Sequence, residues 1–410
     1  MTDLYTQAGM SSERIDAIGP AVERHLGNEK IAGVVTLLER KGVRVHFESY
    51  GQMEREKNKP MTKDAIFRIF SMTKPITAVA LLTLLEQGLV RLTDPVSQFL
   101  PAFSRLKVYD GSGPDGMKLV DPEMEVTIRQ LLTHTSGLTY HFTEFGPVER
   151  MYRTSEISKN KKLAAFVDDL LEMPLAFQPG TMWRYSYGLD VIARVVEIVS
   201  GKAFGDYLQE SIFDPLGMTD TGFYVPSDKL DRFCAEYGFG HVLEPDMYYT
   251  KWWSDEGRLK PRLIRAGDEG LEAKPHDIYR GGHGLVSTAE DYLKFCKMLL
   301  NGGELEGVRI LGRKTVELMT ANHLQGAQTP EDITGPGWGF GLGVRVLTDV
   351  GQCQTLGTAG EHGWSGAACT YYWIDPVEDF IGIYMAQFQP GSFFQSAADF
   401  RTAAYQAIVD

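Results

Sequence analysis

The sequence predicts a mixed α/β fold in which a sheet is built from both ends of the chain and a mainly helical region is inserted between them. Residues 31–50 are rich in β-forming side chains, and that texture returns in the last third of the chain. The middle instead carries apolar patterns of helical period, joined by connections rich in proline and glycine. The most economical architecture is a discontinuous α/β sheet domain over 1–95 and 285–410, with the mainly helical region over 96–284.

The individual elements follow from local patterns, taken in chain order. Two β-rich runs in 31–50 flank a Lys-Gly turn, which is typical of a hairpin. Helical patterns then occupy 71–89, 127–134, 161–172, 188–200 and 289–301. The late strands are predicted from GWGFGLGVRVL, AACTYYWIDP and DFIGIYMAQF, and the final helix from SAADFRTAAYQAIVD.

One stretch in the middle, residues 237–258, is too aromatic for an ordinary solvent loop. It reads YGFGHVLEPDMYYTKWWSDEGR. We expect it to form either a lid or pocket wall, or a segment packed onto the helical region.

Composition argues against several classes of partner. A net charge of -13 over 410 residues disfavours binding to nucleic acid or to an anionic membrane. The N-terminal segment lacks the apolar core of a signal peptide, and no run approaches the roughly 20 apolar residues of a membrane span, so we expect a cytoplasmic protein. The histidines are scattered without an HExxH motif, and four cysteines lie far apart without a CxxC pair, so neither a metal nor another cofactor is expected.

The helical pattern at 71–89 raises a chemical question, because it begins with Ser71-Met-Thr-Lys74. Residues three apart share one face of a helix, so the lysine amine would lie near the serine hydroxyl. Burial would lower the pKa of Lys74 and let it act as a base toward Ser71. However, Ser-x-x-Lys also occurs at 104–107 and 158–161, in segments typical of solvated surface. A capping serine with a solvated lysine fits the same pattern, which alone does not decide.

A rival nucleophile is Ser365 in GWSGA, which resembles the nucleophile elbow of α/β-hydrolases. In that fold the triad histidine follows the serine in the chain. The last of the nine histidines here is His362, so the chain order excludes this alternative.

Several long blocks are far more specific than the tetrapeptide. They are FRIFSMTKPITAVALLTLLEQGLVRLTDPVSQFLPAF (67–103), LLTHTSGLTY (131–140), QPGTMWRYSYGLDVIARVVEIVSG (178–201), GGHGLVSTAEDYLKFCKMLLNGGELEGVRIL (281–311) and GWSGAACTYYWIDP (363–376). Together they resemble the serine β-lactamase and penicillin-binding-protein superfamily, in particular the class C-like branch that includes the family VIII carboxylesterases. The resemblance covers nearly the whole chain and implies a class C β-lactamase-like fold, an antiparallel sheet flanked by helices.

The resemblance also implies the catalytic roles. Ser71 would attack the acyl carbon, and Lys74 would take its proton. Tyr185 would share proton transfer to the leaving group and activate the water that removes the acyl group, because a tyrosine becomes a usable base only beside a cation such as Lys74. The backbone N–H groups of Ser71 and Ala367 would form the oxyanion hole.

Two motifs depart from the pattern of penicillin-recognising members. The second motif, Y-x-N, is Tyr185-Ser186-Tyr187 here, and the third, Lys-Thr-Gly, is Trp364-Ser365-Gly366. The amide and the cation that would hold an anionic β-lactam are therefore missing. Tryptophan at the third motif resembles the esterase branch, and its indole suits neutral acyl and alcohol groups.

The departures also suggest which residues bind the substrate. Besides Trp364, the expected substrate-binding residues are Ser365, Gly366, Tyr187, Trp183 and His362. His362 would share a strand face with Trp364 and could supply a proton or a partial positive charge, although a packed or exposed structural histidine is the favoured interpretation.

The sequence therefore predicts a serine carboxylesterase that cleaves small neutral esters through an acyl-enzyme on Ser71. Its expected partner is a small-molecule ester, with no nucleic acid and no membrane. A β-lactamase or D-Ala-D-Ala peptidase is disfavoured by the two motifs and by the expected location. An acyltransferase of the same fold stays open, because hydrolysis and transfer differ only in the acceptor. A binding protein without activity conflicts with the joint presence of Ser71, Lys74 and Tyr185.

Overall fold

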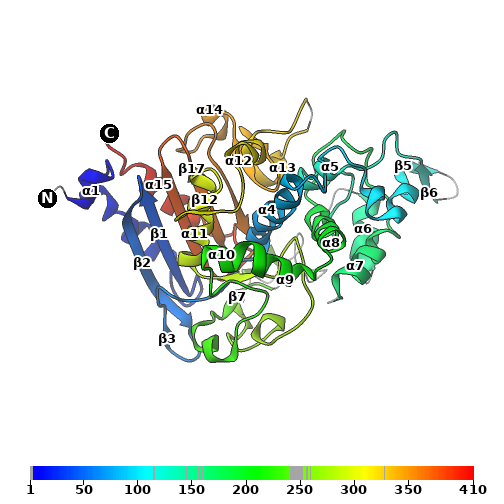
Figure 1. The fold of residues 1–410 in the computed structure, drawn as a ribbon. Helices are drawn as coiled ribbons and strands as arrows, with labels where there is room; N and C mark the ends of the chain where they lie inside the picture. The colour runs from blue at the N-terminus through cyan, green and yellow to red at the C-terminus, as the bar shows by residue number, and fades with distance from the viewer. Residues whose placement is uncertain are drawn as a thin grey trace.

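The fold is centred on an antiparallel sheet of eight strands (Figure 1). The computed structural model describes residues 3–113, 116–143, 146–155, 157, 161–240, 253–254, 257–258, 260–326 and 328–410. The strand order is β14-β15-β16-β17-β18-β1-β2-β3, and each neighbouring pair is antiparallel. The strands are β1 (Gly33–Arg40), β2 (Val43–Glu54), β3 (Lys59–Pro60), β14 (Trp338–Phe340), β15 (Arg345–Leu347), β16 (His362–Gly366), β17 (Thr370–Asp375) and β18 (Phe380–Ala386). This confirms the predicted antiparallel sheet flanked by helices.

The first two strands form the predicted hairpin. Lys41 and Gly42 at its turn have φ values of 51° and 71°, the left-handed conformation that two-residue hairpin turns require. β1 is buried along its whole length and also pairs with β18, so it joins the N-terminal strands to the C-terminal ones. β2 continues to Glu54, beyond the predicted end at residue 50.

Helices cover both faces of this sheet. Val35 and Leu37 of β1 face a core shared with α4 (Thr73–Glu86) and α11 (Ala289–Leu300), whereas Val34 and Leu38 face α15 (Ser396–Tyr405). This alternation follows from the two-residue period of a strand. α3 (Ile18–Glu23) packs against α15, and both chain ends lie on the same side of the molecule (Figure 1).

Mainly helical segments lie between the two groups of strands. They are α5 (Ile128–Leu132), α6 (Pro147–Thr154), α7 (Leu163–Leu170), α8 (Gly188–Ser200), α9 (Phe204–Leu208) and α10 (Asp214–Leu216). α4 packs against α8, which brings the start of α4 close to the segment before α8. A small hairpin of β5 (Val108–Gly113) and β6 (Gly116–Val120) interrupts the helices, and the helical patterns do not predict it.

The helix boundaries lie near the predicted ones, with one difference that concerns the site. The pattern at 71–89 becomes the tight turn η1 (Phe70–Met72) followed by α4, which starts at Thr73. The helix ends at Glu86 because Gly88, with φ of 74°, turns the chain away from it. Ser71 thus belongs to a separate turn at the entrance of the helix.

The remaining α-helices and β-strands of the described chain are short. They are α1 (Leu4–Gln7), α2 (Ser12–Ile15), α12 (Arg313–Thr320), α13 (Glu331–Thr334), α14 (Val350–Cys353), β4 (Phe67–Arg68), β7 (Glu236–Gly238), β8 (Trp253–Ser254), β9 (Gly257–Arg258), β10 (Arg262–Arg265), β11 (Val286–Ser287), β12 (Glu304–Leu305), β13 (Val308–Arg309) and β19 (Phe388–Gln389). None of the described helices has the length and apolar character needed to cross a bilayer.

The aromatic stretch and the division into domains both remain predictions. Most of the aromatic stretch at 237–258 lies outside the described residues, so the choice between a lid and a packed segment stays a prediction. The division into a discontinuous sheet domain and a helical region also stays a prediction, although strands from both ends do share the main sheet.

Candidate active site

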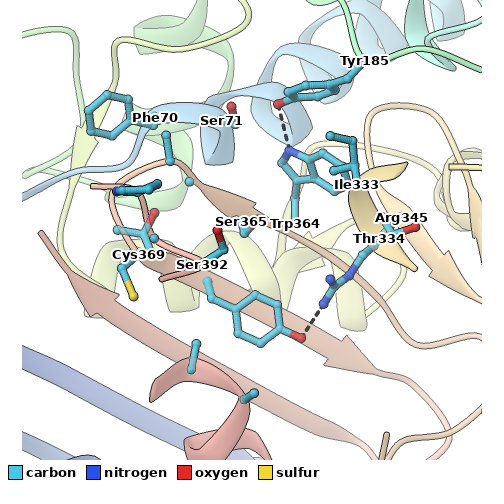
Figure 2. Close-up of a pocket in the computed structure, with 18 of the residues that line it drawn as sticks. Phe70, Ser71, Tyr185, Ile333, Thr334, Arg345, Trp364, Ser365, Cys369 and Ser392 are labelled. Atoms are coloured by element: carbon cyan, nitrogen blue, oxygen red, sulfur yellow. Dashed lines mark hydrogen bonds between the residues drawn. The ribbon is translucent and has the colours of Figure 1, made fainter. Parts of the chain in front are cut away.

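Ser71 occupies a strained turn at the entrance of α4. Phe70, directly before it, has φ of 44°, a left-handed conformation that is uncommon for a bulky residue. Pairing of β4 with β11 and a hydrogen bond from the Ile69 N–H to the Leu285 carbonyl (3.0 Å) hold the chain there. Strain that the surrounding structure maintains in this way is typical of functional sites. The turn places Ser71 in the wall of a cavity (Figure 2).

Lys74 lies one turn later, fully buried behind the serine. Its Nζ is 3.0 Å from Oγ of Ser71 and donates a 2.7 Å hydrogen bond to the carbonyl of Gly282. Burial lowers the pKa of Lys74 to about 7, against the opposing charge of Asp190. An amine with this pKa is uncharged in a large fraction of molecules at neutral pH, so it can accept the serine proton.

Tyr185 stands against the same amine. Nζ of Lys74 lies 4.5 Å from the centre of the tyrosine ring, and the Trp364 indole donates a hydrogen bond to the tyrosine hydroxyl, with 3.3 Å between Nε1 and Oη (Figure 2). A nearby cation and a hydrogen-bond donor both favour the ionised form of a phenol. The structure therefore brings together Ser71, Lys74 and Tyr185, as the sequence predicts.

The third motif lies on β16, beside the serine. Gly366 allows this close approach, because a Cβ atom there would lie 2.4 Å from the carbonyl oxygen of Ile69. Ser365 is exposed in the cavity wall, and Ala367 follows at the end of the strand. Ala367 packs against a small cluster formed by Phe70 and Ala368, so the two backbone segments expected to supply the oxyanion hole are neighbours. A role for their N–H groups stays a prediction.

Three expected substrate-binding residues do not line this cavity. Trp183, Tyr187 and His362 are all buried and absent from its wall. Tyr187 points into the core, where its hydroxyl and Nδ1 of His141 share a 2.5 Å hydrogen bond. Trp183 stacks behind the Tyr185 ring, with 6.2 Å between ring centres.

His362 fits the structural interpretation of this histidine. Its Nδ1 lies 3.2 Å from the carbonyl of Gly360, and burial lowers the pKa of His362 to about 4. The imidazole is therefore neutral at pH 7 and is not placed to give a proton to a substrate.

The site also contains residues that the sequence analysis did not identify. The Gly282 carbonyl that binds Lys74 lies far along the chain, on a glycine-rich segment that also accepts a 2.7 Å hydrogen bond from Thr77 at Gly281. Tyr140 and Phe142 form an aromatic wall, with their rings stacked 4.5 Å apart. The GGHG run and the block at 131–140 were the available signals, but neither indicates a contact with Lys74.

The cavity has a volume of about 640 Å³. Aromatic residues surround its reactive end, namely Phe70, Tyr140, Phe142, Tyr185 and Trp364. Among the described residues of its wall there is no aspartate or glutamate, so no carboxylate is offered there as a general base. Nor do the described residues contain a group of three or more histidine, cysteine, aspartate or glutamate side chains able to hold a metal ion.

Comparison with known proteins identifies the family of this chain. Residues 20–406 match the family described as Beta-lactamase. Protein Rv1367c of Mycobacterium tuberculosis is 31% identical over 90% of this chain and 88% of its own. Esterase EstB of Burkholderia gladioli is 31% identical over 91% of this chain and 90% of its own. The solved structure titled "EstCE1, a hydrolase with promiscuous acyltransferase activity" has a TM-score of 0.77 and 27% identity, and covers 98% of this chain and 100% of its own.

Proposed function

The chain belongs to the Beta-lactamase family, and from this premise we propose that it is a serine carboxylesterase that cleaves small neutral esters through an acyl-enzyme on Ser71. The observation that carries the proposal is the distance of 3.0 Å between the fully buried amine of Lys74 and Oγ of Ser71. Ser71 and Tyr185 both line a cavity that could admit a substrate. Likeness to an esterase over nine-tenths of both chains supports the same activity.

In the acylation step, Lys74 acts as the base. One of its protons binds the Gly282 carbonyl, so the uncharged amine can direct its lone pair at the Ser71 hydroxyl. The serine oxygen attacks the acyl carbon as its proton passes to Nζ. The carbonyl oxygen then carries the negative charge, which the N–H groups of Ser71 and Ala367 would stabilise.

Tyr185 would first give a proton to the leaving group and later take one from the attacking water. When the tetrahedral intermediate collapses, the tyrosine hydroxyl gives its proton to the departing alkoxide, and the tyrosinate formed is stabilised by the Lys74 ammonium and the Trp364 N–H. In deacylation the tyrosinate takes a proton from a water molecule, which attacks the acyl-enzyme. When the second intermediate collapses, the bond between the acyl carbon and Oγ of Ser71 breaks, Oγ takes its proton back from the Lys74 ammonium, and the acid is released.

The walls of the reactive end favour a neutral substrate. Trp364 stands where a cation would bind a carboxylate, and the neighbouring rings of Tyr140 and Phe142 offer apolar surface. A cavity of about 640 Å³ has room for a small acyl group and an alcohol.

Acyl transfer is a second candidate activity. A relative in structure is itself described as a hydrolase with promiscuous acyltransferase activity. The same acyl-enzyme would serve both reactions, because an alcohol bound against the aromatic wall could replace water as the acceptor. The ratio of ester product to free acid, measured with and without an added alcohol, distinguishes the two.

The test of the proposed function is the mass of the intact protein after brief exposure to a p-nitrophenyl ester, an organophosphonate or a β-lactam. We expect an acyl adduct from the ester and a stable adduct from the phosphonate, both lost in Ser71→Ala. Ser104→Ala is the matched control, because Ser104 begins another Ser-x-x-Lys but is exposed and bonded to the Pro101 carbonyl. An adduct that survives in Ser71→Ala would reassign the nucleophile.

A further inference from the structure

A carboxylate, Asp190, is buried beside the catalytic lysine. It lies in the first turn of α8 and is 0% exposed. Its nearest cation is Arg280, whose Nη1 is 4.0 Å from Oδ1 of the aspartate, and no described side chain donates a hydrogen bond to either carboxylate oxygen. A buried ionisable group without such partners is costly to the fold, and its presence calls for a reason.

The short segment Arg280–Gly282 links this carboxylate to Lys74. A Cβ atom on Gly282 would lie 2.4 Å from Oδ2 of Asp190, so the glycine backbone rests directly on the carboxylate. A Cβ atom on Gly281 would lie 2.0 Å from the carbonyl oxygen of Leu189, on the same helix. Both positions therefore require glycine, and the segment is held tightly against the start of α8.

The other side of the segment holds α4. The Gly281 carbonyl accepts a 2.7 Å hydrogen bond from Thr77, and the Gly282 carbonyl accepts one of equal length from Lys74. The position of the lysine amine thus depends on a segment that Asp190 supports from behind.

Asp190 also differs in charge from everything else around the amine. The titratable groups that interact with Lys74 come from η1, from the segment after α5, from the segment before α8 and from α8 itself. They are Ser71, His134, Tyr140, Tyr185 and Asp190. Arg280, from the segment before β11, faces Asp190, and His283 of the same segment lines the cavity. Asp190 is the one carboxylate in this set.

We propose that Asp190, paired with Arg280, is a positioning residue for acylation: it holds the Gly282 carbonyl against Lys74 and supplies the negative charge beside the lysine amine. This inference rests on the proposed function, in which Lys74 is the base. It assigns a purpose to a buried ion pair whose own side chains do not line the cavity and which supports the cavity wall only from behind, at Gly282.

The direction of the effect follows from charge. A negative charge stabilises the ammonium form of Lys74, so its loss makes the ammonium form less stable and lowers the pKa of Lys74. Because the base must be uncharged to act, the acid limb of the pH–rate profile then moves to lower pH. A residue with a merely structural role would lower the rate without moving this limb.

The experiment is the pH dependence of kcat/KM for p-nitrophenyl butyrate in Asp190→Asn, which removes the charge and keeps the shape. We expect the acid limb to move down by roughly one pH unit. We also expect the plateau to fall roughly 10- to 100-fold, because the Gly282 carbonyl is less well held. Asp190→Glu keeps the charge, so its limb should stay near that of the wild type.

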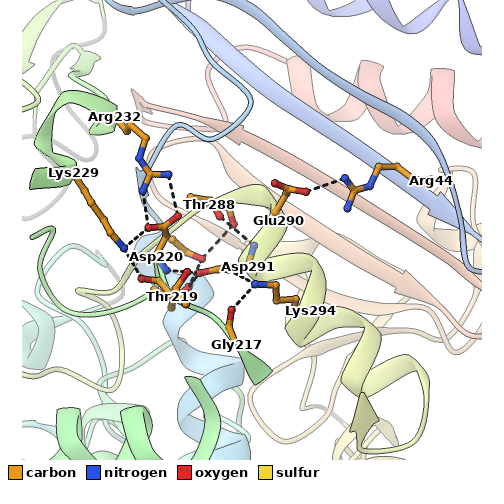
Figure 3. A network of polar contacts seen from close by, with 12 residues as sticks. Arg44, Gly217, Thr219, Asp220, Lys229, Arg232, Thr288, Glu290, Asp291 and Lys294 are labelled. Atoms are coloured by element: carbon orange, nitrogen blue, oxygen red, sulfur yellow. Dashed lines mark hydrogen bonds and ion pairs between the residues drawn. The ribbon is translucent and has the colours of Figure 1, made fainter. Parts of the chain in front are cut away.

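The matched control is Asp291→Asn on α11. Asp291 is also buried, but it binds the Asp220 N–H at 2.7 Å and pairs with Lys294 at 2.9 Å in a separate network (Figure 3). Its substitution should leave the acid limb in place. The measured quantity is the pH at which the acid limb lies, and this does not depend on the enzyme concentration. Partial loss of folded enzyme therefore does not disturb the comparison.

An acid limb that stays in place in Asp190→Asn overturns the inference while leaving the proposed function intact. Absence of ester hydrolysis and of a Ser71 adduct in the wild type instead overturns the proposed function. Asp190→Ser, a smaller residue that introduces no clash, serves as a second variant. If neither variant folds while Asp291→Asn does, Asp190 is a structural residue and the inference is wrong.

Discussion

The indole N–H of Trp364 donates a hydrogen bond to the hydroxyl of Tyr185, with 3.3 Å between Nε1 and Oη. The sequence suggested only apolar surface at position 364, because an indole there replaces the lysine of the Lys-Thr-Gly motif. The structure shows that tryptophan still supplies a donor to the tyrosine, but one without charge. A neutral donor can support a tyrosinate without attracting a carboxylate into the cavity.

Trp364→Phe is expected to separate the two properties of this side chain, because phenylalanine keeps an aromatic ring and removes the N–H donor. We expect kcat for p-nitrophenyl butyrate to fall roughly tenfold, the effect of losing about 1.4 kcal/mol of transition-state hydrogen bonding. Steady-state kinetics provide the measurement. Trp364→Ala, which also removes the packing surface, should damage turnover further. A rate for Trp364→Phe equal to the wild type would show that the hydrogen bond does not contribute.

The proton-transfer residues should each be needed for turnover. Lys74→Ala removes the base, and Tyr185→Phe removes the hydroxyl while the ring can still stack on Trp183. Both changes should reduce kcat/KM by two or more orders of magnitude, which is usual for the loss of an acid–base group. Phe103→Leu, a change at a buried residue that does not line the cavity, controls for general loss of stability. Full activity in either variant would show that its assigned role is wrong.

The rate should depend on pH through Lys74. Because burial lowers the pKa of Lys74 to about 7, the amine is protonated and inactive in more acidic solution and becomes a base as the pH rises. We therefore expect kcat/KM to rise with pH and to level off above about pH 7 to 8. A profile measured with p-nitrophenyl butyrate between about pH 5 and 9 provides the check. A flat profile through neutrality would contradict this assignment.

Part of the candidate site could be predicted from the sequence, because two of its residues lie in one motif with a fixed local geometry. Ser71 and Lys74 are three residues apart at the start of a helix, so their proximity follows from helical spacing. Tyr185 required a long block of resemblance, since nothing local distinguishes it from the other tyrosines. Its contact with Lys74 depends on the packing of α4 against α8.

The rest of the site depends on long-range packing that no local pattern reveals. Gly282 and Lys74 are 208 residues apart in the chain, yet they share a hydrogen bond. Tyr187 lies two residues after Tyr185 but occupies the N-terminal end of α8 and turns toward His141, so closeness in sequence to the tyrosine did not place it in the cavity. His362 shares β16 with Trp364 and is likewise buried away from the cavity. Proximity in sequence was therefore a poor guide to which side chains line the cavity.

The structure predicts a preference for neutral esters over β-lactams, and the reason lies at the reactive end of the cavity. A charge-assisted contact between a lysine and a carboxylate is worth roughly 1.5 to 3 kcal/mol, which is one to two decades in binding. Trp364 removes this contact. Tyr187, which replaces the asparagine of the second motif, is turned into the core and cannot restore the missing amide.

The decisive measurement is the ratio of kcat/KM for p-nitrophenyl butyrate to that for the cephalosporin nitrocefin. We expect kcat/KM for the ester to exceed that for nitrocefin by at least one to two decades, which is the loss of binding expected when the lysine–carboxylate contact is absent. Trp364→Lys restores a cation but removes the indole that packs in the cavity, so it should weaken ester turnover without by itself creating a β-lactamase, because the amide of the second motif is still absent. A larger value for nitrocefin in the wild type would overturn the esterase proposal and favour a β-lactamase instead.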